Sequence, residues 1–60
     1  MKIPTLSEQI IIEEILAEAS TFGLRTEVRE SAEKIWIERK QEEDFTLLDA
    51  YHLAFLDWIK

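Results

Sequence analysis

The feature that most constrains this chain is its shortage of residues that interrupt helices, because its 60 residues include one glycine and one proline. Its apolar residues recur mainly at intervals of three and four, which is the spacing of one face of an α-helix. Short strands joined by tight turns would need more turn residues and an alternating pattern. The sequence therefore predicts an all-α fold, a compact three-helix domain that covers residues 1–60.

The first predicted helix covers residues 6–22. Thr5 and Ser7 can each cap its start, and Thr5 does so in a capping box with Glu8. Both caps are compatible with the sequence. Gly23 provides the left-handed residue that commonly follows the end of a helix. The apolar face of this helix consists of Ile11, Ile12, Ile15, Leu16, Ala19 and Phe22.

The second and third helices are predicted over residues 25–41 and 47–59, on either side of a polar run at residues 41–44. Thr46 can cap the third helix, with Asp49 in the position that completes an imperfect capping box. The apolar stripe of the second helix consists of Leu24, Val28, Ala32, Ile35 and Trp36. The main face of the third consists of Leu47, Leu48, Tyr51, Ala54, Phe55, Trp58 and Ile59.

A chain this short has a small core, because it buries only about 60% of the surface that the unfolded chain exposes. It has no cysteine, so disulfide bonds cannot support the fold. Large apolar side chains dominate small cores, and removal of a buried tryptophan typically costs about 3 to 5 kcal/mol. The residues expected at the centre of the core are Phe22, Ile35, Trp36, Tyr51, Phe55 and Trp58.

Four apolar residues lie away from the predicted core faces. At about 100° per residue, Ile10 and Ile37 lie opposite the main stripes of their helices, and Leu53 and Leu56 make the third helix apolar almost all round. Isolated exposed apolar residues are common, which is a sufficient explanation for Ile10 or Ile37 alone. The pair on the third helix favours an interface instead. We therefore expect a homodimer, or a complex with a different protein, with these four residues as the candidate interface.

The chain is acidic, with thirteen acidic and seven basic residues and a formal charge of −6. This charge disfavours direct binding of nucleic acids or anionic membranes and favours a basic partner. Glu8, Glu13, Glu14 and Glu18 on the first helix suggest an alternative function, an acidic DNA mimic that occupies a basic nucleic-acid-binding protein surface. The sequence shows no signal peptide and no apolar run of about 18 residues, so a cytoplasmic protein is expected.

The sequence contains no established catalytic or ligand-binding motif, so we expect a non-enzymatic protein without a cofactor or metal. The carboxylates of Glu13, Glu14 and residues 42–44 are typical of a solvated surface. His52 has no convincing partner and is expected at the surface or at the rim of an interface. The third helix is too acidic to read DNA in a helix-turn-helix, and the basic residues of the second helix are interleaved with glutamates.

Residues 27–60 comprise a charged helix, a brief break, an Ala-Tyr pair at residues 50–51 followed by Ala54, and Trp-Ile-Lys at residues 58–60. In these features the segment resembles the short helical accessory proteins encoded in the early regions of temperate, lambdoid bacteriophages. The resemblance covers little more than half of the chain. It implies a small regulator that biases phage development or host physiology through contacts with a host or phage protein partner, in the host cytoplasm. It transfers no specific binding residue.

Overall fold

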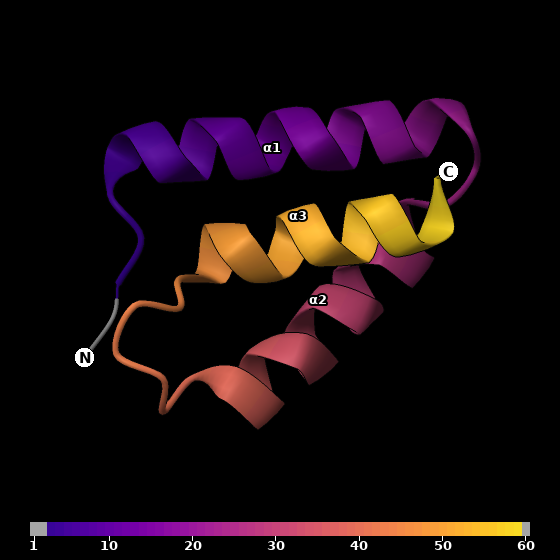
Figure 1. Ribbon diagram of the computed structural model, residues 1–60. Coiled ribbons are helices and arrows are strands. Elements are labelled where there is room, and N and C mark those ends of the chain that lie inside the picture. Colours follow the sequence, from indigo (N-terminus) through magenta and orange to yellow (C-terminus); the bar gives the residue numbers. More distant parts are fainter. Residues whose placement is uncertain (1–2, 60) are drawn as a thin grey trace.

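The computed structural model describes residues 3–59, which form three helices and no strand. Helix α1 spans Leu6–Thr21, α2 spans Arg25–Arg39 and α3 spans Leu47–Trp58. Helices α1 and α2 diverge from the turn that joins them, and α3 lies between them (Figure 1). This arrangement confirms the predicted all-α, three-helix fold. Residues 1, 2 and 60, which belong to the predicted domain, lie outside the described residues.

Matching capping boxes begin α1 and α3. The Thr5 side chain accepts a hydrogen bond of 3.1 Å from the backbone N–H of Glu8, whose carboxylate accepts one of 2.9 Å from the Thr5 N–H. Thr46 and Asp49 make the same pair of bonds, at 3.1 and 3.0 Å. Each box satisfies backbone donors that the first turn of a helix leaves unpaired. Of the two caps considered for the first helix, the structure therefore has Thr5 and not Ser7.

The end of α1 is a Schellman turn centred on Gly23, whose φ of 72° lies in the left-handed region. The N–H of Leu24 donates to the carbonyl of Ala19 at 2.9 Å, and the N–H of Gly23 donates to Ser20 at 3.0 Å. These bonds satisfy carbonyls that the last turn would otherwise leave unpaired. They also reverse the chain so closely that α2 begins at Arg25.

The core lies where the three helices meet. Val28 is the largest side chain that is completely removed from solvent, and three alanines on α2 and α3 are equally buried, at Ala32, Ala50 and Ala54. Such small side chains allow helix backbones to approach closely, and α2 and α3 make the most extensive contact of the three pairs. No buried polar residue occurs among residues 3–59. The other buried residues are Ile12, Ile15, Leu16, Ala19, Phe45 and Tyr51.

Two aromatic residues predicted at the centre of the core are exposed instead. Phe22 follows the last residue of α1 and is 59% exposed. Trp58 is the last residue of α3 and is 45% exposed, with its indole N–H donating to the Ser31 hydroxyl at 2.7 Å. Both lie at helix ends, where the small core no longer covers a large ring. Tyr51 is buried as predicted. Ile35, Trp36 and Phe55 are half-buried.

The connection between α2 and α3 contains a buried aromatic residue that the sequence analysis did not place in the core. Phe45 stacks on Trp36, with ring centroids 6.4 Å apart and ring planes at 22°. The Arg39 guanidinium carbon lies 4.3 Å from the centroid of the Phe45 ring. Arg39 also donates two hydrogen bonds of 2.9 Å to the Glu42 carboxylate. These contacts attach the polar connection to the end of α2.

Candidate functional site

The four apolar residues predicted as an interface are all exposed. The exposed fraction is 54% for Ile10, 66% for Ile37, 40% for Leu53 and 63% for Leu56. They do not lie in one pocket, because Ile10 lines a groove along α1 and the other three do not. The structure therefore presents at least two candidate surfaces.

The first surface is the outer face of α3, which we define by Leu53 and Leu56 together with the exposed His52 and Asp57. Within Leu47–Trp58 the only charged residues other than histidine are Asp49 and Asp57. The Asp49 carboxylate accepts the hydrogen bond from the Thr46 N–H that completes the cap. The outer face of α3 is therefore poor in charge, which suits contact with another apolar surface.

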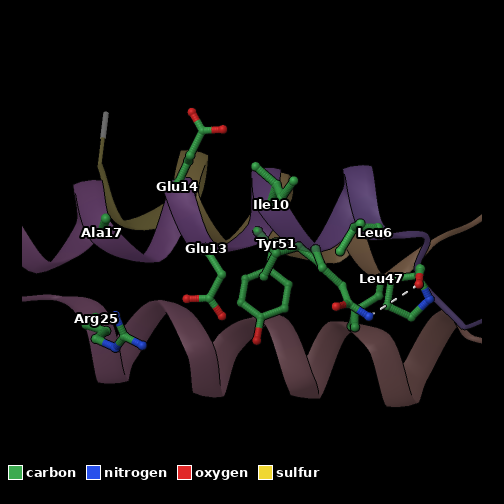
Figure 2. Close-up of a pocket in the computed structure, with 11 residues that line it drawn as sticks. Leu6, Ile10, Glu13, Glu14, Ala17, Arg25, Leu47 and Tyr51 are labelled. Atoms are coloured by element: carbon green, nitrogen blue, oxygen red, sulfur yellow. Dashed lines mark hydrogen bonds between the residues drawn. The ribbon is translucent and has the colours of Figure 1, made fainter.

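The second surface is the α1 groove, an open hollow with a volume of about 740 Å³. Its floor includes the buried Ile12 of α1 and Tyr51 of α3, with the half-buried Leu47 beside them. The exposed side chains of Leu6 and Ile10 form its apolar wall. In Figure 2, Leu6 and Ile10 lie along α1, and the Tyr51 ring lies on the other side of the α1 ribbon from the Ile10 side chain. The other lining residues are Pro4, Gln9, Glu13, Glu14, Ala17 and Arg25.

This groove was not predicted from the sequence, although some of its lining residues follow a pattern within α1. Leu6, Ile10 and Ala17 are separated by four and seven residues, which places them on one flank of α1, beside the core stripe. The contribution of Tyr51 depends on how α3 crosses α1, and no local pattern contains that information. The exposure of Ile10 could therefore be predicted, but the residues that line the groove with it could not.

The charge around the α1 groove is uneven. Glu13 and Glu14 lie at its edge, and Arg25 lies at the end near Ala17 (Figure 2). Neither carboxylate makes a hydrogen bond or an ion pair with another residue in the range 3–59. Helix α1 contains no lysine or arginine, and its acidic residues are Glu8, Glu13, Glu14 and Glu18.

Tyr51 is the residue of the groove with a clear pKa shift. Burial raises the pKa of the Tyr51 phenol above its usual value, and the carboxylates of Glu33 and Glu13 raise it further. The guanidinium groups of Arg29 and Arg25 oppose this increase. The phenol therefore stays neutral at physiological pH and contributes a ring to the floor of the groove without adding charge.

We expect the stability of the fold to fall in alkaline solution as Tyr51 ionises. The folded-state pKa lies above the unfolded value of about 10, so the folded chain holds the phenolic proton more tightly. This stabilisation is fully present below the unfolded pKa and is lost as the pH rises through the folded pKa. Urea unfolding on both sides of the unfolded pKa should show a smaller alkaline loss for Tyr51→Phe than for the native chain.

The ionisation itself can be followed directly, because Tyr51 is the single tyrosine of the chain. Titration of phenolate absorbance should give a higher pKa in the folded chain than in urea. An equal or lower value in the folded chain would contradict the assigned burial and charge environment.

The described residues show no built site for a metal ion. No group of three or more histidine, aspartate or glutamate side chains in the range 3–59 is placed to hold one. His52 is exposed on α3 and makes no hydrogen bond or ion pair with another described residue. Within the same range, no helix combines the length and apolar character needed to cross a membrane. The features with a functional interpretation are therefore the outer face of α3 and the α1 groove.

Comparison with known proteins adds no relative to this description. No protein-family model matches the chain, and no significant match was found among curated proteins or solved structures.

Proposed function

We propose that this chain is a non-enzymatic protein-interaction module that forms a homodimer through the outer face of α3. The observation that carries the proposal is the exposure of Leu53 and Leu56, one turn apart, on a helix with few charges. Full burial of a leucine side chain is worth roughly 1.5 to 3 kcal/mol relative to full exposure. A domain of this size has little stability in excess, so a partner that covers both leucines would stabilise it appreciably.

A second copy of the chain is the partner that this face suits best. A twofold dimer brings the same face of each copy together, so the face must tolerate its own charges. The outer face of α3 presents Asp57 and no other free carboxylate of the helix, since Asp49 caps the helix start. Glu8 likewise caps α1, so pairing of two α1 surfaces would bring Glu13, Glu14 and Glu18 of one copy toward the same three residues of the other.

The interface must extend beyond the two leucines. The chain exposes 4426 Å², and a stable interface of standard size covers about 800 Å² on each partner. Roughly a fifth of the surface would therefore be involved, far more than two partly exposed side chains provide. Ile37 on α2 is a candidate contributor because it is the most exposed of the four predicted residues.

We expect Leu53→Glu with Leu56→Glu to abolish self-association while preserving most of the helical content. Each change places a carboxylate where the proposed dimer excludes water, and burial of an unpaired charge opposes association strongly. Sedimentation equilibrium over a wide concentration range measures the effect. Ile10→Glu is the matched control, because it changes the charge by the same amount per site in the α1 groove.

A strictly monomeric native chain would refute the homodimer. Dissociation by Ile10→Glu, with the α3 double variant still dimeric, would move the interface to the α1 groove. Simultaneous loss of helicity and association in the α3 variant would show that folding and dimerisation are coupled, as in obligate dimers.

The alternative function, an acidic mimic of DNA, is favoured by a different observation, the absence of basic residues from the acidic helix α1. Such a protein would occupy a basic surface of a nucleic-acid-binding protein. Its binding would weaken steeply as salt increases, whereas an apolar interface would be much less sensitive. Partner affinity measured at low and high ionic strength distinguishes these two modes.

The regulatory role implied by the resemblance to lambdoid phage accessory proteins agrees with either binding mode and stays a prediction. The cytoplasmic location stays a prediction as well. Identification of a native partner by affinity capture and mass spectrometry tests the regulatory role most directly.

A further inference from the structure

We propose that the α1 groove binds a basic amphipathic helix of a partner protein. This proposal concerns a different surface from the outer face of α3 and does not depend on self-association. It rests on the shape of the groove, on the apolar side chains that line it and on the charge at its edge.

The dimensions of the groove suit a short helix. From Leu6 to Ala17 the groove follows α1 for twelve residues, and the eleven steps between them at about 1.5 Å each give roughly 16 Å, or three helical turns. Its volume of about 740 Å³ lies within the range of ligand-binding clefts, although the groove is open along one side. A helix with apolar anchors at positions i, i+3 or i+4 and i+7 would place them along such a groove.

The lining provides an apolar contact for those anchors. Leu6 and Ile10 expose most of their side chains, while Ile12 and Tyr51 form a buried floor. The Tyr51 phenol is neutral at physiological pH, and its pKa is raised further by burial, so it adds no charge to the floor. A partner helix that covers Leu6 and Ile10 would remove two large apolar side chains from water, which is the main source of affinity for a helix in a groove.

The edge of the groove selects for positive charge in the partner. The carboxylates of Glu13 and Glu14 make no hydrogen bond or ion pair with residues 3–59, so lysines or arginines beside the apolar anchors can pair with them. Helix α1 supplies no competing positive charge, and Arg25 contributes at one end only. Helix α1 of a second copy is a poor occupant, because it carries the same four glutamates.

Two synthetic helical peptides of about four turns test the proposal. Both have leucines at positions i, i+3, i+4 and i+7; the basic peptide has lysines on either side of this stripe, and the acidic peptide has glutamates there. We expect the basic peptide alone to bind, by fluorescence anisotropy of a labelled peptide. Ile10→Ser should weaken its binding about ten-fold or more. Ile37→Ser, the same kind of change on an exposed residue of α2, should leave its binding unchanged.

The charged edge and the proposed dimer are tested in the same assay. The double variant Glu13→Gln with Glu14→Gln should bind the basic peptide with lower affinity, and this affinity should depend less on salt. The Leu53→Glu variant should bind the basic peptide with the affinity of the native chain. That result would show that peptide binding in the groove does not depend on self-association. Circular dichroism of each variant confirms that the helices are retained.

Three results would overturn the proposal. The first is equal binding of the acidic and basic peptides, which would show that charge does not select the partner. The second is unchanged affinity in Ile10→Ser with loss of binding in the double glutamine variant, which would indicate a purely electrostatic surface of the DNA-mimic kind. The third is the absence of binding by the basic peptide at concentrations where it is helical.

Discussion

Phe45→Ala is expected to remove about 3 to 5 kcal/mol from the free energy of unfolding, the usual range for a buried phenylalanine. The total for a 60-residue domain is only about 3 to 9 kcal/mol at typical values per residue, so most of the fold would be lost. The reason is the stack in which Phe45 contacts Trp36 and Arg39. Without the ring, the connection between α2 and α3 loses its main attachment.

Urea unfolding followed by circular dichroism measures this loss, and Phe22→Ala is the control. Phe22 is also a phenylalanine in a connection, but it is exposed. Its replacement should change the free energy of unfolding by about 0.5 kcal/mol or less, as is usual at the surface. Equal effects at the two positions would contradict the assignment of Phe45 to the core.

Val28→Asp is expected to leave the chain largely unfolded at neutral pH. Val28 is completely buried, and no buried polar residue of the described range could pair with a new carboxylate. An unpaired buried charge typically costs several kcal/mol, comparable with the whole stability of the domain. Far-ultraviolet circular dichroism should show this as a loss of helical signal.

Ile37→Asp introduces the same side chain on the exposed side of the same helix and should retain native helicity. The comparison separates burial from the low helix propensity of aspartate, which both variants share. A native melting curve for Val28→Asp would show that Val28 does not face a closed core.

The helices could be predicted from the sequence because their determinants are local. Periodic apolar residues, the Thr5 and Thr46 caps and Gly23 lie within or next to the segments they define. Helix α1 ends at Thr21 and α2 at Arg39, one and two residues before the predicted ends. Such differences are usual, because the last turn of a helix is held by few hydrogen bonds.

The composition of the core was harder to predict. Phe45 follows a polar run, and its burial depends on contact with Trp36, nine positions earlier in the chain. Trp58 has the spacing of a core residue, but α3 ends there and the ring is left partly exposed. Periodicity gives the direction of a side chain from its helix, and it does not show whether a neighbouring helix extends far enough to cover it.

The same distinction applies to the candidate surfaces. The exposure of Leu53 and Leu56 could be predicted from the pattern of one helix, because a residue on the side away from the core stripe faces outward. The α1 groove requires the packing of α3 against α1, which adds Tyr51 and Leu47 to a lining that α1 begins with Leu6 and Ile10. Single-helix patterns therefore identify exposed residues, whereas a concave surface depends on how helices are placed together.

Because no polar residue is buried in the described core, its apolar positions should accept many substitutions over evolution. Apolar side chains of similar volume replace one another at modest cost, so most core positions constrain residue class more than identity. The helix ends impose a different kind of constraint, because an N-cap needs a short side chain that accepts a hydrogen bond and a left-handed position strongly favours glycine. The positions that fix where the helices begin and end are therefore Thr5, Gly23 and Thr46. Two chains with this fold could differ at nearly every core residue and still keep a capping residue at the two threonine positions and glycine at position 23.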